Sequence, residues 1–317
     1  MEINNLIDLN LTQSSGQTSQ PPWFKKENNE YLDIINIDSI PVLIKASQKD
    51  INSLNIDYEL PIGIEENINK KKLINEINRI YDLNFDLNNF YTLLETDFQL
   101  KDATIFCEGL RLFQAKNPFE CIISSISSAN NSIKRWTNSI NTIKYKWGEK
   151  ITFPSGDFHT FPKPEILSNV YLDNENESEI ENKDIELCNN NLKACGVGYR
   201  NKYIKKASKL FIQDIDINKI YKMTYEEAFE TIIQVPGVGP KVADCILLYG
   251  FNFQEAFPSD VWIKRIISYL YFNQKEISAE KARNYGMECF GEYAGYVQLY
   301  LFHYARKSGL MEKLKNK

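Results

Sequence analysis

A lysine and an aspartate lie nineteen residues apart in the stretch "VPGVGPKVADCILLYGFNFQEAFPSDVWIKR", which runs from Val235 to Arg265. Lys241 follows a turn of two glycines and two prolines, and Asp260 follows a proline and a serine. A neutral lysine amine is a nucleophile that forms Schiff bases at carbonyl-like carbons. An ionised aspartate can stabilise a cation that develops beside it. The pair is compatible with covalent chemistry. A solvated surface lysine is the alternative for Lys241, whereas Asp260 can cap a helix and stabilise a cation at the same time.

The residues around Lys241 predict two helices joined by a tight hairpin. Thr224 and Glu227 form a capping box at the start of the first helix, and Pro240 suits the first position of the second. Gly237 and Gly239 allow the backbone amides between the helices to face outward beside a helix N-terminus. Such amides bind anions, and a DNA phosphate fits them. An ordinary tight turn between helices is the alternative.

Lys241 is expected in the first turn of the second helix, where cations are disfavoured. The helix dipole and burial would both lower the pKa of Lys241, because each opposes the ammonium form. The position alone leaves two alternatives open, a free amine at neutral pH and a solvated surface lysine.

The segment "VPGVGPKVADC…PSD" resembles the signature of the helix-hairpin-helix-GPD superfamily of DNA glycosylases. Its lysine and cysteine are similar to those of the 8-oxoguanine DNA glycosylase branch. Three further segments resemble the lesion-gap segment, the helix entry before the hairpin and the C-terminal pocket helix of that branch: "NPFECIISSISSANNSIKR", "CGVGYRNKYI" and "YAGYVQLYLF". The resemblance implies a DNA N-glycosylase with lyase activity on abasic sites, acting on damaged double-stranded DNA in base excision repair.

The resemblance also implies roles for individual residues. The catalytic pair would be Lys241 and Asp260. The residues that hold the flipped base would be Gly16, Cys245, Gln298 and Phe302. The residues that contact DNA would be Asn130, Arg135, Tyr199, Arg200, Gly237 and Gly239.

Two features depart from the pattern of that branch. The motif Ser15-Gly16-Gln17 is followed by "TSQPPWFKK", where the family has an aromatic residue, an arginine and a tryptophan in close succession. Trp262 stands where many members have a histidine near the phosphate of the lesion.

The elements that position these residues predict an α+β protein. "YLDIINI", "IPVLIKAS" and "INSLNIDYEL" are rich in Ile, Val and Tyr and predict an antiparallel sheet in an N-terminal domain, residues 1–110. From Asn117 onward apolar residues recur at three and four, which predicts an all-α domain over residues 111–317. The resemblance implies that this is the helix-hairpin-helix-GPD domain. An acidic segment near residues 173–186 is expected to be a dispensable surface insertion.

The net charge of −5 hides an uneven distribution. The acidic segment, Asp173–Glu186, holds seven acids and one lysine, so that the rest of the chain is net +1. The following "GYRNKYIKKASK" carries five basic residues, two tyrosines and no acid. Basic residues interleaved with aromatics suit a phosphate backbone, and a solvated helix face is the alternative.

Composition excludes several classes of protein. No stretch approaches the roughly 18 apolar residues of a membrane span, so no membrane association is expected. Six cysteines without a C-x-x-C pair and two histidines indicate no metal, no cofactor and free thiols. We expect a monomer in the cytoplasm, and the Asn-, Ile- and Lys-rich composition is typical of AT-rich bacterial genomes.

The sequence leaves two other functions open. The more similar one is that of a glycosylase of the same superfamily that removes another damaged base, although the monofunctional members of the superfamily use the aspartate without a lysine. The branches that carry a four-cysteine cluster are excluded, because only Cys289 follows Cys245. A non-enzymatic helix-hairpin-helix DNA-binding protein would need the hairpin but neither Lys241 nor Asp260.

Overall fold

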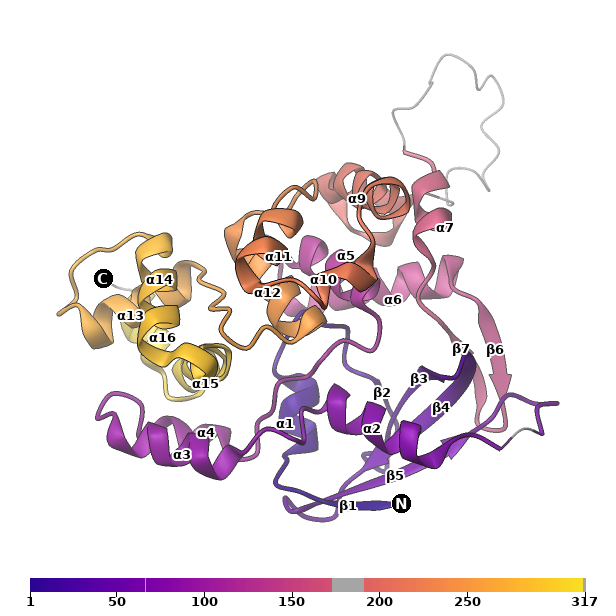
Figure 1. Ribbon diagram of the computed structural model, residues 1–317, viewed down its shortest axis with the longest axis horizontal. Coiled ribbons are helices and arrows are strands. Elements are labelled where there is room, and N and C mark those ends of the chain that lie inside the picture. The colour runs from indigo at the N-terminus through magenta and orange to yellow at the C-terminus, as the bar shows by residue number, and fades with distance from the viewer. Residues whose placement is uncertain (66, 173–190, 316–317) are drawn as a thin grey trace.

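The computed structural model describes residues 1–65, 67–172 and 191–315, so the predicted acidic insertion lies outside the described residues. A sheet occupies one end of the molecule and a group of C-terminal helices the other, with α12 between them (Figure 1). About half of the chain is helical and about an eighth is strand, which confirms the α+β prediction. None of the described helices has both the length and the apolar character needed to cross a bilayer.

The sheet has five antiparallel strands in the order β1-β5-β4-β3-β2. The strands are β1 (Glu2–Asn4), β2 (Phe24–Lys25), β3 (Tyr31–Ile37), β4 (Ile40–Ser47) and β5 (Ser53–Glu59). The three predicted strands are confirmed as β3, β4 and β5. Asp38 and Ser39 join β3 to β4 with φ of +52° and +69°, the geometry that suits a two-residue hairpin. One face packs on α2, and the other is covered by a hairpin of β6 (Lys150–Phe153) and β7 (Gly156–His159).

The helices follow the chain in order through both domains. They are α1 (Leu9–Ser14), α2 (Lys70–Ile80), α3 (Leu87–Thr96), α4 (Ala103–Cys107), α5 (Pro118–Ser128), α6 (Ile133–Trp147), α7 (Pro164–Asn169), α9 (Asn201–Gln213), α10 (Ile217–Ile220), α11 (Tyr225–Ile232), α12 (Pro240–Phe251), α13 (Val261–Tyr271), α14 (Ala279–Phe290), α15 (Ala294–Lys307) and α16 (Leu310–Lys315). Short 3-10 turns are η1 (Leu192–Cys195), η2 (Gly198–Arg200) and η3 (Gly291–Tyr293).

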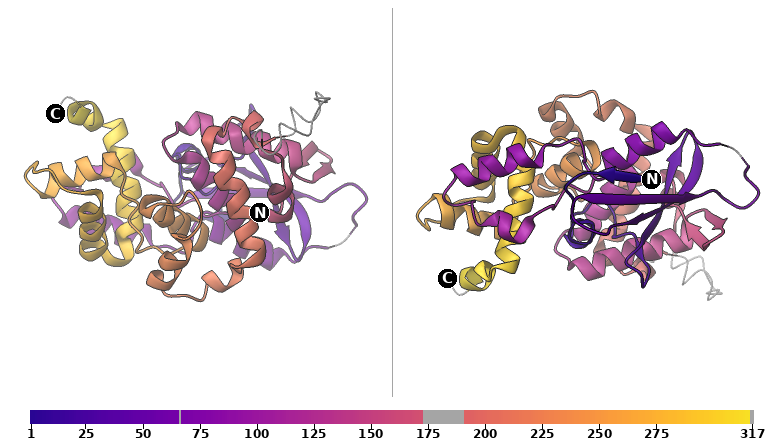
Figure 2. Two further views of the ribbon diagram at one scale, coloured as in Figure 1. Left: turned by 90° about the horizontal axis from the view of Figure 1, so that it is seen from above. Right: turned by 90° about the horizontal axis from the view of Figure 1, so that it is seen from below.

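The N-terminal region contains helices that the sequence analysis did not predict. The described residues from 70 to 107 form α2, α3 and α4 rather than further strands. Helices α3 and α4 lie beside α15, in the C-terminal half of the molecule (Figure 2). Leu87, Phe90 and Leu94 recur at three and four and enter the helical core. The predicted boundary near residue 110 therefore does not separate the two hydrophobic cores, because residues that precede it belong to the core of the helical domain.

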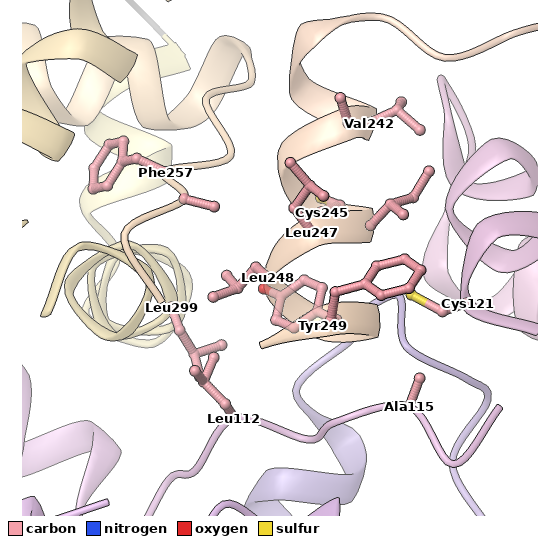
Figure 3. Close-up of a cluster of buried hydrophobic side chains, with 14 of the residues drawn as sticks. Leu112, Ala115, Cys121, Val242, Cys245, Leu247, Leu248, Tyr249, Phe257 and Leu299 are labelled. Atoms are coloured by element: carbon pink, nitrogen blue, oxygen red, sulfur yellow. The ribbon is translucent and has the colours of Figure 1, made fainter. Parts of the chain in front are cut away.

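Helix α12 is the central helix of the molecule. All ten of its residues from Val242 to Phe251 are buried, as is typical of a helix that is packed on every side. Figure 3 shows its side chains between those of Leu299 on α15 and Cys121 on α5. A helix held on all sides fixes the direction of any side chain at its N-terminal end, where Lys241 lies.

A buried cluster of charges joins the sheet to the helical domain. Asp33 of β3 forms ion pairs with Lys116 and, at 3.1 Å, with Lys144 of α6. Lys116 also lies 3.7 Å from the buried carboxylate of Glu120 on α5. Burial alone would raise the pKa of Asp33, but the two ammonium groups outweigh it and hold that pKa below its ordinary value. The ion pairs therefore fix the sheet against α5 and α6.

Candidate active site

One cavity of about 70 Å³ brings together segments from both ends of the chain. It is lined by Ser15, Gly16, Gln17, Thr18, Lys241, Cys245, Tyr249, Pro258, Asp260, Gln298, Leu299 and Phe302. All six residues that were predicted to act in catalysis or to hold the base are among them. The lining comes from the loop after α1, from α12, from the loop before α13 and from α15.

Lys241 occupies the second position of α12 and is half-buried. Its ammonium contacts the thiol of Cys245 one turn further along the helix. Burial is the largest single influence and lowers the pKa of Lys241, but Cys245, Asp260 and Asp244 together outweigh it. The pKa is raised, so the prediction of a lowered pKa was wrong. The helix dipole and burial oppose the ammonium form, but the fold places groups nearby that favour it.

Asp260 is the N-cap of α13, as its position in the sequence predicted. Its Oδ1 accepts hydrogen bonds of 2.9 Å from the amides of Trp262 and Ile263. Within the described residues Oδ2 accepts none, and the carboxylate lines the cavity near the ammonium of Lys241. One oxygen therefore holds the helix, which leaves the other for a group that enters the cavity.

Cys245 and Phe302 come from different helices and line the same cavity, as the two sides of a slot for a flat base would require. Burial raises the pKa of the Cys245 thiol, although Lys241 opposes the effect. Gln298 lies one turn before Phe302 on α15 and is 7% exposed. Its Oε1 is buried without a hydrogen-bond partner, which is uncommon for an amide in a folded protein.

The loop that carries Gly16 is fixed by side-chain contacts. Gln17 accepts from the amide of Phe113 at 2.8 Å and donates to the carbonyl of Arg111 at 2.9 Å. Gly16 has a φ of +86°, and a Cβ there would lie 2.4 Å from the side chain of Ile133 on α6. The positive φ favours glycine, and any other residue would also displace the side chain of Ile133. The carbonyl of Gly16 accepts no hydrogen bond from any described residue, so it is free to accept one from a ligand.

Three of the residues that were predicted to contact DNA lie on separate elements of the helical domain. Asn130 is exposed in the turn between α5 and α6, with a φ of +49°. Arg135 is exposed in the first turn of α6, and Tyr199 is 58% exposed in η2. These three side chains are accessible to a partner.

Arg200 is instead 7% exposed. Its guanidinium donates to the carbonyls of Ala129, Asn130 and Val197, and it lies over the ring of Tyr199 at 4.4 Å. The side chain therefore holds the turn that presents Asn130. Any contact between Arg200 and a nucleotide would require it to leave these carbonyls, so the predicted DNA contact of Arg200 stays a prediction.

The hairpin between α11 and α12 has the predicted form, including the capping box of Thr224 and Glu227. The amides of Gly237 and Gly239 have no hydrogen-bond partner among the described residues. Gly237 has a φ of +86°, and a Cβ there would lie 2.7 Å from the ring of Tyr203 on α9. Free amides beside the N-terminus of α12 have the geometry that suits an anion.

The groups that hold α12 in place were not predicted from the sequence. Asp244 is fully buried and forms a bidentate ion pair with Arg283 of α14, at 2.7 and 3.2 Å. Tyr225 of α11 donates to the same carboxylate. Tyr249 was missed as a lining residue, although its spacing of four from Cys245 was a signal that it shares the same helix face.

Comparisons with known proteins show the family of the chain. Residues 2–122 match the 8-oxoguanine DNA glycosylase, N-terminal domain, and residues 123–292 match the HhH-GPD superfamily base excision DNA repair protein. A "Probable N-glycosylase/DNA lyase" of Methanothermobacter thermautotrophicus is 43% identical, over 98% of this chain and 96% of its own length.

Solved structures show the same similarity. MBOgg1 in complex with a low-affinity DNA ligand aligns with a TM-score of 0.79 and 28% identity, over 97% of this chain and 96% of its own. The 8-oxoguanine glycosylase/lyase of Clostridium acetobutylicum, bound to double-stranded DNA with cytosine opposite 8-oxoguanine, aligns with a TM-score of 0.77 and 28% identity, over 96% and 93%. A 3-methyladenine DNA glycosylase of Archaeoglobus fulgidus shares the fold, with a TM-score of 0.75 at 20% identity, over 98% and 99%. The chain therefore belongs to the HhH-GPD superfamily of base excision DNA repair enzymes, in its 8-oxoguanine DNA glycosylase/lyase family.

Proposed function

We propose that this chain excises 8-oxoguanine from duplex DNA, preferably opposite cytosine, and then cleaves the strand through a Schiff base on Lys241. The observation that carries the proposal is the composition of the cavity. It contains a lysine, a carboxylate with one free oxygen, and the glutamine oxygen that has no partner inside the protein. A single chain supplies every one of these groups, so we also propose that the enzyme acts as a monomer.

Access to the glycosidic bond requires the damaged nucleotide to rotate out of the duplex. The free amides of Gly237 and Gly239 would bind a backbone phosphate and hold the strand beside the cavity. Asn130 is exposed on a turn with a left-handed backbone, so its side chain can enter the space that the base leaves. Tyr199 would wedge the neighbouring stack, since its ring is exposed and lies over the guanidinium of Arg200.

The flipped base would lie between Cys245 and Phe302, with the amide of Gln298 on its Watson–Crick edge. Oxidised guanine carries a hydrogen on N7, where guanine has an acceptor. The free carbonyl of Gly16 would accept from that hydrogen and repel guanine. One such hydrogen bond is worth about 1–3 kcal/mol, too little to reject the millions of guanines in a genome. Flipping, fit and chemistry must therefore each contribute to the discrimination.

Lys241 would attack C1′ of the damaged nucleotide after it has lost its proton. The C1′–N bond forms, and the electron pair of the glycosidic bond leaves with the base, which takes up a proton. The free oxygen of Asp260 would stabilise the positive charge that develops on the sugar. The sugar ring then opens to an imine, a proton leaves C2′, and the bond between C3′ and its phosphate oxygen breaks to nick the strand.

Incubation with a duplex that carries one 8-oxoguanine opposite cytosine tests the proposal. The expected result is release of the free base together with a nicked strand. A parallel duplex with 3-methyladenine separates the readings that remain. Excision of the alkylated base with no excision of 8-oxoguanine would support the other glycosylase. Binding without any excision would support a non-enzymatic DNA-binding protein.

Excision should be faster opposite cytosine than opposite adenine, by about ten- to a hundredfold. Flipping leaves the opposite cytosine with acceptors at O2 and N3, and arginine is a donor-only group that suits them. Adenine presents an amino donor toward the same guanidinium, and each mismatched contact costs about 1–3 kcal/mol. Single-turnover rates on the four opposite-base duplexes measure this preference.

Arg135→Ala should flatten the preference more than it slows the cytosine duplex, because Arg135 is the exposed arginine of the pair. Lys134→Ala is the matched control, since it removes a neighbouring exposed charge. Arg200→Ala separates two roles of Arg200. A flattened preference indicates a base contact, whereas equal slowing on all four duplexes indicates that Arg200 only holds the turn. An Arg135→Ala enzyme that keeps the full preference would exclude Arg135 from reading the opposite base.

A further inference from the structure

Three residues of α12 follow one another along the wall of the cavity. Lys241, Cys245 and Tyr249 are spaced by four, so they share one face of the helix, and all three line the cavity. Lys241 is half-buried, whereas Cys245 and Tyr249 are 4% and 5% exposed. Figure 3 shows Tyr249 one turn beyond Cys245, between α12 and Leu299 of α15. Tyr249 therefore lies at the inner end of the cavity, opposite the end that holds the nucleophile.

The hydroxyl of Tyr249 differs from those of the other buried tyrosines. Six tyrosines are buried in the part of the chain that the structure describes. Five of them have hydrogen bonds: Tyr31 with Asn10, Tyr81 with Gln13, Tyr225 with Asp244, Tyr296 with Asp82 and Tyr300 with Leu110. The hydroxyl of Tyr249 has no partner among the described residues. The residue is 5% exposed and lines the cavity, and its hydroxyl oxygen is not fully enclosed by protein, so a molecule in the cavity can reach it.

A second polar group in the same cavity also has no partner. The Oε1 atom of Gln298 is buried and accepts no hydrogen bond. Burial raises the pKa of Tyr249 well above its ordinary value, so the phenol keeps its proton and can donate at any working pH. Two polar groups without protein partners in one cavity are expected where a ligand supplies the missing partners.

The chemistry at the mouth of the cavity fixes the orientation of a bound nucleotide. C1′ of the sugar must lie beside Lys241 and Asp260, so the edge of the base that is remote from the glycosidic bond points inward. In 8-oxoguanine that remote edge carries the carbonyl oxygen O6. We propose that the hydroxyl of Tyr249 donates a hydrogen bond to O6 of the flipped base and is a specificity-determining residue of the excision step. The inference rests on the proposed function, since it assigns a contact within the same site.

The test compares two substrates in the wild-type enzyme and in Tyr249→Phe. One duplex carries 8-oxoguanine opposite cytosine, and the other carries the analogue that has hydrogen in place of O6. Tyr249→Phe should slow single-turnover excision of 8-oxoguanine by about tenfold, which corresponds to about 1.4 kcal/mol. It should slow excision of the analogue less, because the analogue has no oxygen at C6 that could accept from the hydroxyl. Cleavage of an abasic duplex should also be unchanged, because no base enters the cavity.

Two controls separate a base contact from a structural role. The melting temperature of Tyr249→Phe should not fall, because the hydroxyl has no protein partner to lose. Tyr145→Phe, at an exposed ring on α6, should behave as wild type in all three assays.

Each outcome bears on one claim. Unchanged excision of 8-oxoguanine by Tyr249→Phe beside an active wild type would overturn the inference alone. Equal losses on both base duplexes and on the abasic duplex would also overturn it, since they indicate a displaced helix. A wild-type chain that cleaves abasic DNA but leaves 8-oxoguanine in place would overturn the proposed function, and the inference with it.

Discussion

Replacing Lys241 with glutamine should abolish both the covalent trapping of the protein on DNA by borohydride and the nicking of the strand. Borohydride reduces the imine between lysine and sugar to a stable amine, so trapping reports the nucleophile directly. Glutamine has no amine that can form the imine, although its length is similar. Gel analysis of the trapped complex on 8-oxoguanine and abasic duplexes gives the result.

The DNA affinity of Lys241→Gln should survive, because the free amides of the hairpin remain. Lys222→Gln, which removes an exposed lysine away from the cavity, is the control and should trap as wild type. Trapping that persists in Lys241→Gln would move the nucleophile to another residue.

The raised pKa of Lys241 gives this reaction a pH dependence. Below that pKa the ammonium dominates, and the fraction of free amine rises about tenfold for each pH unit. Single-turnover trapping on an abasic duplex should therefore accelerate from pH 6 to pH 9 without reaching a plateau. A plateau already near pH 7 would show that DNA binding lowers the pKa of Lys241 below the value set by its neighbours Cys245 and Asp260.

Replacing Asp260 with asparagine should slow base excision by about 10²–10³-fold. The loss of one electrostatic contact to a charge that develops in the transition state typically has this size. Asparagine caps a helix about as well as aspartate, so the bonds to Trp262 and Ile263 should remain while the charge is lost. Single-turnover excision of 8-oxoguanine measures the effect. Cleavage of an abasic duplex should fall less, because no glycosidic bond is broken there.

A matched variant separates charge from capping. Asp86 caps α3 with the same pair of hydrogen bonds, to Asn88 and Asn89. Asp86→Asn makes the identical substitution away from the cavity, so its melting temperature should change as little as that of Asp260→Asn, while its excision rate stays that of the wild type. An unchanged excision rate in Asp260→Asn would leave that carboxylate with a structural role only.

The sequence by itself determined the local structure around the site. The strands 31–37 and 40–47, the capping box at Thr224 and the N-cap at Asp260 were predicted and confirmed. Each depends on contacts within a few residues, on alternation or helical spacing of apolar side chains and on backbone preferences. The order of four family-like segments also identified the enzyme family, which the comparisons confirm.

The tertiary structure alone decided what surrounds each of these residues. It placed α3 and α4 against α15, buried Arg200 among carbonyls, and left the hydroxyl of Tyr249 without a partner. It also reversed the expected direction of the pKa of Lys241, because Asp260 and Cys245 lie near the ammonium. The physical reason is the distance along the chain over which each kind of interaction acts. Capping and periodicity act between neighbours in the chain, whereas burial, charge and hydrogen-bond satisfaction depend on segments that only the folded chain brings together.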